Sequence, residues 1–306
     1  MSAINISRSI IISASPAQVY KILSDFSQWQ PWSPWLIMEE DVDVKIVPGK
    51  RYYSWNGKRV GAGERTITNE KLNRRIDYDL TFLKPFKSHA KVAFELYEHG
   101  DHTEVIWIMG SKLPFFMFWM KKAMTAFLNA DYDRGLQMLK EYGETGSVHS
   151  KLEALGFEDF PETHFLGLKR TAPMSKMGLA MSQDFGKLQA YAEKIGMDTQ
   201  ASFSQYHKWD VVRQQVVYTA GFSLSAPINN PDSDFLMGVI PATKVYKVRH
   251  TGPYHYLGNM WAMGMNLKQN KVFKSSKKIH PFEVYRNSPA DTKPENLVTE
   301  VHFPVK

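Results

Sequence analysis

The chain has 306 residues and no cysteine, which excludes disulfides, thiolate metal sites and a cysteine nucleophile and fits a reducing compartment. Long hydrophobic runs are also missing. The densest run, residues 113–120, ends at Lys121, far short of the roughly 20 residues that a membrane span needs. The first 13 residues are too short and polar for a secretory leader. We therefore expect a cytoplasmic protein without a membrane span.

Signatures of the common catalytic and DNA-binding classes are absent too. There is no G-x-S-x-G elbow, no Walker loop, no G-x-G-x-x-G after a strand and no H-E-x-x-H, and no cofactor is expected. His99 and His102 flank a predicted polar turn, which would expose them rather than make them converge on a metal. The net charge of +7 is spread over both halves without a helix-turn-helix pattern, so no direct DNA binding is expected.

What is present is an ordinary globular composition, with 43% hydrophobic and 23% charged residues. A chain of this length is comfortable for two domains. A long helical pattern gives way to small and polar residues over 143–155. This break predicts domains at 1–146 and 159–306, joined by a linker at 147–158.

The first half has the element order of a helix-grip fold. A strand at 4–13 is followed by Ser15-Pro16, a helix N-cap and first-turn proline. Strand-like runs fill 41–109, and a helical stripe covers about 115–142. The class is therefore α+β, with a curved antiparallel sheet around a long C-terminal helix.

Several phrases carry a family resemblance: S-R-S-I-I-I-S-A-S-P-A-Q-V-Y (7–20), W-S-P-W (32–35), S-W-N-G-K-x-V-G-x-G (54–63), L-T-F-L-K-P-F (80–86) and D-x-x-x-G-L-x-x-L-K-x-Y (131–142). They resemble the START/polyketide-cyclase-like superfamily, whose members bind lipids, polyketides, hormones or protein clients. The resemblance implies an apolar cavity between the sheet and the long helix. Six aromatic residues are candidates to line it, and the alternative for each is an ordinary core position: Trp32, Trp35, Trp55, Phe82, Phe94 and Trp107.

The second half contains a twofold internal repeat. Lys169–Pro173 corresponds to Arg249–Pro253, and each is followed by a helical pattern and then by matching tetrads, Phe203–Tyr206 and Phe282–Tyr285. Strand, helix, strand, strand, duplicated, predicts two units joined through their sheets, with a cleft between the copies.

The C-terminal phrases F-E-V-Y, D-T-x-P-E, T-E-V and F-P-V fall in register with a second family. They resemble the gyrase-inhibitor-like small-molecule-binding domains, which also serve as effector-binding domains of AraC- and MerR-type regulators. The resemblance implies that Glu300 lies at the floor of a ligand cleft. In a closing strand where side chains alternate, Glu300 faces away from the helix-packed set, towards solvent or a cleft. The alternative is a solvated strand carboxylate.

Aromatic and polar side chains are expected to form the walls of the same cleft: Tyr285, Tyr254, Trp261, Tyr206, His207 and Trp209. A carboxylate within aromatic walls suits flat, hydrophobic, often cationic molecules. Three functions remain open. The chain is a binder that senses, sequesters or detoxifies such compounds, a hydrolase or cyclase that uses Glu300 with Tyr254 or Tyr285, or a regulator of a protein partner such as gyrase or a transcription factor.

Overall fold

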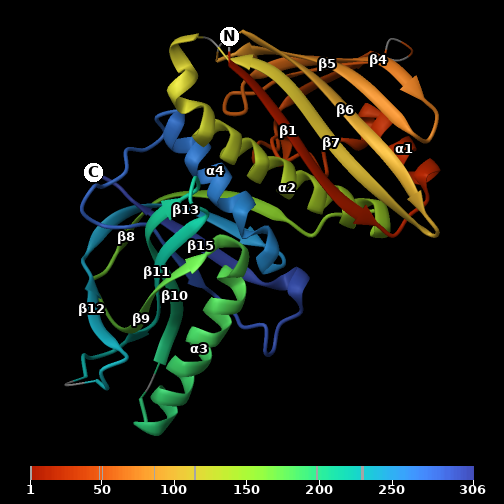
Figure 1. Ribbon diagram of the computed structural model, residues 1–306. Coiled ribbons are helices and arrows are strands. Elements are labelled where there is room, and N and C mark those ends of the chain that lie inside the picture. The colour runs from red at the N-terminus through yellow and green to blue at the C-terminus, as the bar shows by residue number, and fades with distance from the viewer. Residues whose placement is uncertain are drawn as a thin grey trace. The chain divides into compact units, whose positions relative to one another are not determined.

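Strand pairing sorts the chain into two separate antiparallel sheets (Figure 1). The computed structural model describes residues 2–47, 49, 51–85, 87–113, 115–197, 199–228 and 231–306, and the side chains of 2, 113 and 115–117 lie outside that description. The chain divides into two units at residues 148 and 149. Each unit contains one sheet and the helices that pack on it. This arrangement is the α+β class that the sequence predicts.

The N-terminal unit contains a seven-stranded sheet in the order β1-β7-β6-β5-β4-β3-β2. From β2 to β7 each strand pairs with the next as a hairpin, and β7 then pairs with β1 along the whole length of β1. The strands are β1 (Ser2–Ile12), β2 (Asp43–Val47), β3 (Tyr52–Asn56), β4 (Ala62–Lys71), β5 (Arg75–Lys84), β6 (Ser88–His99) and β7 (His102–Leu113). Every strand-like run of the sequence therefore corresponds to one strand.

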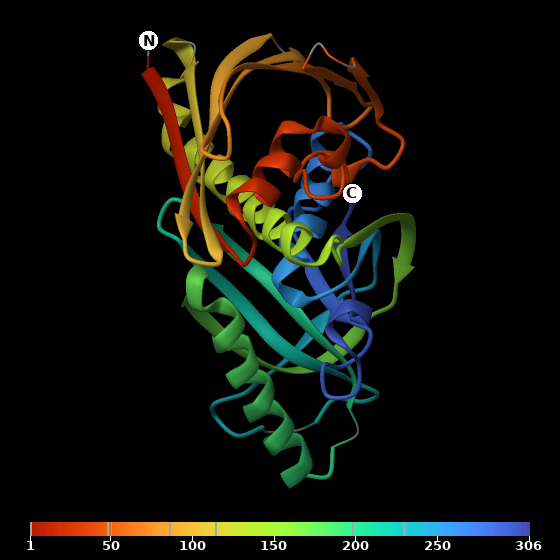
Figure 2. The same ribbon diagram turned by 90° about the vertical axis from the view of Figure 1, so that its right-hand side faces the viewer.

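Two helices cover the concave side of this sheet (Figure 2). Helix α1 (Pro16–Ser24) begins at Ser15, whose Oγ accepts a hydrogen bond from the backbone N–H of Gln18, as the cap pattern predicts. Helix α2 (Lys121–Thr145) starts later than expected, because residues 115–120 form a 3₁₀ helix, η3. Short 3₁₀ turns η1 (Phe26–Gln28) and η2 (Leu36–Met38) follow α1.

Helix α2 approaches the sheet closely at one point. A Cβ atom on Gly135 would lie 2.7 Å from the Trp107 ring, so only glycine allows this approach. Tyr132 packs on the same ring, with centroids 4.0 Å apart. The C-terminal half of α2 therefore fills the space beneath β7.

A buried carboxylate holds the turn between β3 and β4. Glu39, which is 2% exposed, accepts hydrogen bonds from the backbone N–H groups of Lys58, Arg59 and Val60 at 2.8–2.9 Å. The backbone at Gly57 lies so close that a Cβ there would be 2.5 Å from Glu39 Oε2. One side chain thus satisfies three backbone donors that the strand ladder leaves free.

The C-terminal unit contains an eight-stranded sheet in the order β12-β9-β11-β10-β14-β15-β13-β8. The strands are β8 (Lys151–Phe160), β9 (Thr163–Pro173), β10 (Thr199–Asp210), β11 (Gln215–Leu224), β12 (Leu236–Ile240), β13 (Thr243–Thr251), β14 (Phe282–Tyr285) and β15 (Val298–Pro304). The helices are α3 (Met177–Lys194) and α4 (Leu257–Gln269), with 3₁₀ turns η4 (Met174–Lys176), η5 (Tyr254–Tyr256) and η6 (Pro294–Asn296).

The predicted duplication is present in this element order. The copies are β9-α3-β10-β11 and β13-α4-β14-β15, and they join where β10 pairs antiparallel with β14. Edge strands cross over between the copies, because β8 precedes the first copy but pairs with β13, whereas β12 precedes the second but pairs with β9.

The predicted linker differs from the structure. Most of residues 147–158 belong to β8, whose side chains are largely exposed. An edge strand with so little burial has no apolar alternation, and its sequence therefore reads as a loop.

We predict that Glu39→Ala destabilises the N-terminal unit by about 2–4 kcal/mol, because three backbone donors lose a charged acceptor. Urea unfolding followed by tryptophan fluorescence measures this, since six of the eight tryptophans lie in this unit. The matched control is Glu40→Ala, which changes an exposed neighbour. Equal stability of the two variants would contradict the structural role of Glu39.

Candidate functional site

The most unusual polar group of the C-terminal sheet is the carboxylate of Glu283, which is 2% exposed. Its Oε2 accepts hydrogen bonds from the hydroxyls of Tyr206 and Tyr285 at 2.7 and 2.8 Å. Its Oε1 accepts one from the indole N–H of Trp261 at 2.5 Å. Tyr285 also lies 3.1 Å from Ser204 Oγ. Both carboxylate oxygens therefore accept hydrogen bonds, and all three donors are neutral.

The internal repeat explains this convergence. Ser204 pairs directly with Glu283 across β10 and β14, and the two residues occupy equivalent positions in the two copies. Tyr206 and Tyr285 are likewise equivalent, each two residues further along its strand. Because alternate residues of a strand share a face, both tyrosines project to the side of Glu283.

Both helices of the unit pack on this face. Tyr285 makes an edge contact with Phe185 of α3, with centroids 5.7 Å apart, and Trp261 belongs to α4. The cluster therefore lies on the helix-covered side of the sheet, at the junction of the two copies.

Electrostatically, Glu283 is a buried acid without a cation. Burial raises the pKa of its carboxyl group, although the hydrogen bonds from Trp261, Tyr206 and Tyr285 oppose the rise. Burial and the neighbouring Glu283 also raise the pKa values of Tyr206 and Tyr285 well above the ordinary range. No lysine or arginine among the described residues forms an ion pair with Glu283.

Further aromatic rings extend the cluster towards the surface. Trp209 stacks on Tyr206 with centroids 5.0 Å apart and is 38% exposed. A bulge between Tyr206 and Lys208 turns Trp209 onto the same face as Tyr206, although strict alternation would oppose them. The half-buried Tyr254 lies 5.6 Å from the Tyr285 ring. Five of the predicted aromatic residues thus gather in one place.

The carboxylate at their centre is not the one that the sequence indicates. Glu300 was expected beside these rings, and that placement is wrong, because the rings contact Glu283. His207 also lies elsewhere. Its ring bonds Thr219 Oγ1 at 2.8 Å on the opposite face, and burial lowers its pKa to about 4. The shared face of Glu283 and Tyr285 in F-E-V-Y was the signal that could have identified the right carboxylate.

Glu300 faces away from the helices, as the alternation predicts, but it is neither solvated nor free. It is 1% exposed, Arg249 from β13 donates to Oε1 at 2.7 and 3.0 Å, and Arg286 donates to Oε2 at 2.5 and 2.9 Å. Lys247 Nζ lies 3.7 Å from Oε2. Burial alone would raise the Glu300 pKa, but the two arginines and Lys247 outweigh it and lower the pKa to about 2.

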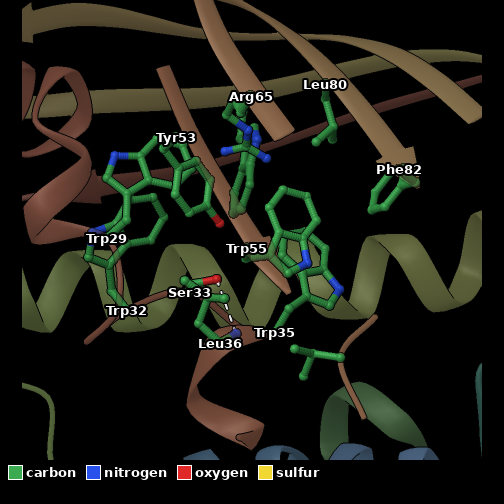
Figure 3. Close-up of a pocket in the computed structure, with 12 residues that line it drawn as sticks. Trp29, Trp32, Ser33, Trp35, Leu36, Tyr53, Trp55, Arg65, Leu80 and Phe82 are labelled. Atoms are coloured by element: carbon green, nitrogen blue, oxygen red, sulfur yellow. Dashed lines mark hydrogen bonds between the residues drawn. The ribbon is translucent and has the colours of Figure 1, made fainter. Parts of the chain in front are cut away.

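The N-terminal unit holds a separate cavity of about 50 Å³ (Figure 3). Five of the six predicted aromatic residues line it: Trp32, Trp35, Trp55, Phe82 and Trp107. Phe94 lies behind them, fully buried and stacked on Trp107 at 4.9 Å. Lining residues that sequence reasoning missed include Trp29, Tyr53, Leu80 and Arg65.

The position and chemistry of this cavity differ from the expectation. Its lining residues come from β3, β4, β5 and β7, from residues 29–36 and from Val60, and none of the described α2 residues is among them. The reason is the close approach at Gly135, which brings Tyr132 onto Trp107 and closes the space beneath the helix. The wall also contains a charged side chain, Arg65, so the cavity is not purely apolar.

Two negative observations apply to the described residues. No group of three or more His, Cys, Asp or Glu side chains is placed to hold a metal ion there. Among the helices described, none combines the length and the apolar character needed to cross a membrane.

Comparison with known families indicates small-molecule binding. Residues 156–306 match the family described as GyrI-like small molecule binding domain, and residues 3–144 match the family described as polyketide cyclase / dehydrase and lipid transport. The chain therefore joins an N-terminal polyketide-cyclase-like domain to a C-terminal GyrI-like small-molecule-binding domain, as the resemblances predicted.

Solved structures show more distant similarity. The crystal structure of the EcmrR C-terminal domain is 19% identical, with 51% of this chain and 98% of that chain covered and a TM-score of 0.41. The EcmrR–DNA complex is 17% identical, with 62% of this chain and 69% of that chain covered and a TM-score of 0.44. The solution structure of the Aha1 dimer from Colwellia psychrerythraea is 20% identical, with 47% of this chain and 98% of that chain covered and a TM-score of 0.36. Scores of this size carry no argument about function. No curated protein matches the chain.

Glu300→Gln should destabilise the C-terminal unit at neutral pH. The pKa of about 2, against an ordinary value of 4.5, corresponds to about 3 kcal/mol. A lowered folded-state pKa gives stability that is present above pH 4.5 and is lost as pH falls towards 2. Urea unfolding between pH 3 and pH 7 should therefore show a wild-type advantage that shrinks with acidification. A constant difference would refute the ionic role of Glu300.

Glu283→Gln should have the opposite pH dependence. A raised folded-state pKa means that ionised Glu283 costs stability at high pH, and that this cost disappears below the carboxyl's ordinary pKa. The glutamine variant should therefore gain stability relative to wild type as pH rises from 4 to 8. The same urea series measures it, and a relative loss on raising the pH would contradict a raised pKa.

Proposed function

We propose that the chain is a cytoplasmic binder of hydrophobic, flat, cationic small molecules that acts in sensing, sequestration or detoxification without binding DNA directly. The observation that carries this proposal is the buried Glu283 carboxylate, which has three neutral hydrogen-bond donors, a border of aromatic rings and, among the described residues, no cationic partner. The match to a small-molecule-binding family supports the binding role.

The charge of the ligand follows from the missing counter-charge. A buried carboxylate held only by neutral donors has a raised pKa and is costly to ionise. A cationic ligand would supply the missing charge and recover part of that cost on binding. Tyr206, Tyr285 and Trp261 already orient both carboxylate oxygens, so little further ordering is needed.

The shape of the ligand follows from the rings. Trp209 is exposed, and Trp261, Tyr254 and Tyr285 are half-buried, so the cluster of rings around the carboxylate reaches the surface of the unit. Flat aromatic cations gain from such walls both apolar contact and cation–π attraction.

A second candidate is hydrolysis of a reactive bound compound. A carboxyl group with a raised pKa that contacts two tyrosine hydroxyls is suited to general acid–base chemistry. In that case Glu283 would activate water, and Tyr285 or Tyr254 would donate a hydrogen bond to the developing charge on the substrate.

Calorimetry with a matched pair of probes tests the binding proposal. N-methylquinolinium is a flat cation, and 1-methylnaphthalene is its neutral isostere. We expect Glu283→Gln to weaken binding of the cation about tenfold to a hundredfold, because a contact to a charged group contributes about 1.5–3 kcal/mol. Binding of the neutral isostere should change much less.

Two further variants complete the design. Glu295→Gln removes an exposed carboxylate of the same unit and should change neither affinity. Glu300→Gln tests the alternative carboxylate, after thermal melting has shown that the variant is folded. A selective loss of cation binding in Glu300→Gln but not in Glu283→Gln would transfer the site to Glu300. Equal affinity of wild type for the cation and its isostere would refute the counter-charge role of Glu283. Loss of ester or strained-ring hydrolysis in Glu283→Gln, with binding intact, would favour the enzyme.

A further inference from the structure

The cavity of the N-terminal unit is lined by hydrogen-bond donors that lack acceptors. Arg65 is 4% exposed, and among the described residues its Nε and Nη1 have no hydrogen-bond partner. Trp32 and Trp107 line the same cavity, and their indole N–H groups are also buried without a hydrogen-bond partner among the residues that the structure describes. The lining contains no aspartate or glutamate.

An unpaired buried guanidinium needs a physical reason. Arginine keeps its charge in proteins, and a buried charge without an anion is strongly unfavourable. Most buried polar groups in native structures are satisfied, so each exception suggests a missing partner. Three unsatisfied donor side chains around one cavity point to the same kind of partner, which is an acceptor with negative charge.

The surrounding rings compensate the charge only partly. The guanidinium lies 4.4 Å from the Trp29 ring centroid and 5.6 Å from that of Tyr78. Such contacts attract a cation but supply no hydrogen-bond acceptor in the plane of the guanidinium. Arg65 stands on β4 opposite Tyr53 of β3 and Leu80 of β5, so its guanidinium projects from the middle of the sheet into the cavity (Figure 3).

We propose that this cavity binds a small aliphatic monocarboxylate, whose carboxylate accepts hydrogen bonds from Arg65 while its alkyl end packs on Trp55, Leu80 and Phe82. A carboxylate matches the planar donor array of a guanidinium. The site is distinct from the Glu283 cluster in residues and in charge.

The volume limits the size of the ligand. One water needs about 10–15 Å³ for its centre, so a cavity of about 50 Å³ holds about three to five waters. A molecule of about four to six heavy atoms fits the same space, because bonded atoms lie closer together than waters do. Acetate, propionate and butyrate are in this range. Trp35, Val60 and Phe82 are half-buried rather than buried, which places the entrance at the end away from Trp29.

Thermal unfolding of the full chain, with sodium butyrate titrated against sodium chloride at equal ionic strength, tests the proposal. Butyrate should raise the midpoint of the N-terminal transition with saturation, and the neutral isostere butyramide should bind at least about tenfold more weakly. Arg65→Met should bind butyrate about tenfold to a hundredfold more weakly than wild type. Arg8→Met, which removes an exposed arginine paired with Asp133, is the matched control and should bind normally.

Stability without ligand separates a binding role from a structural one. Replacing an unpaired buried charge by an apolar side chain of similar length should leave the midpoint unchanged or raise it. A lower midpoint for Arg65→Met, together with no saturable effect of butyrate on wild type, would overturn the proposal and assign Arg65 to packing around water. An equal butyrate response in both proteins would overturn it as well. If Arg65→Met does not fold, the affinity of Arg65→Lys for butyrate and the ratio of wild-type affinities for butyrate and butyramide test the proposal instead. Equal wild-type affinities for the two compounds would overturn it.

Discussion

The antiparallel pairing of β10 with β14 is the constraint on which the C-terminal unit depends. This single contact joins the two copies of the repeat into one sheet, and it sets Ser204 directly opposite Glu283. The same register brings Tyr206 and Tyr285, one from each copy, to the two sides of one carboxylate. A slip of one residue would turn these side chains to the opposite face and dissolve the cluster. The site therefore follows from the duplication, although its charged member occurs in only one copy.

Three buried charged side chains show how differently a fold can compensate a charge. Glu300 is paired with Arg249 and Lys247 on β13 and with Arg286 directly after β14, which makes it part of a structural ion cluster. Glu283 has hydrogen bonds from neutral donors but no counter-charge in the described part of the chain. Arg65 has aromatic faces and neither an acceptor nor a counter-charge among the described residues. The less completely the protein neutralises a buried charge, the more binding free energy a ligand of opposite charge would gain there. By this criterion Glu300 belongs to the scaffold, and Glu283 and Arg65 belong to candidate sites.

Much of the fold could be predicted because its determinants are local. Ser15 and Pro16 define the start of α1, and the strand-like runs of the first half each become a strand, because alternation and capping act over a few residues. The spacing from Lys169 to Arg249 predicted the duplication. Strand β8 was missed because an exposed edge strand carries little apolar alternation. Helix α2 was placed too early because the apolar residues of η3 directly precede it. The depth to which α2 settles on Trp107 depended on Gly135, a contact between distant segments.

The amino-acid sequence by itself determined the α+β class, the two domain families and most of the aromatic residues that border the candidate sites. Only the tertiary structure decided which charge belongs to which site. In the structure Glu283 and Glu300 lie on opposite faces of adjacent strands, and whether a carboxylate meets Arg249 and Arg286 or Tyr206 and Trp261 depends on strand register and on the bulge at His207. Burial and counter-charge are properties of the assembled sheet, because they depend on residues far apart in the chain. They distinguish Glu300, which is paired with two arginines, from Glu283, which has only neutral hydrogen-bond donors among the described residues.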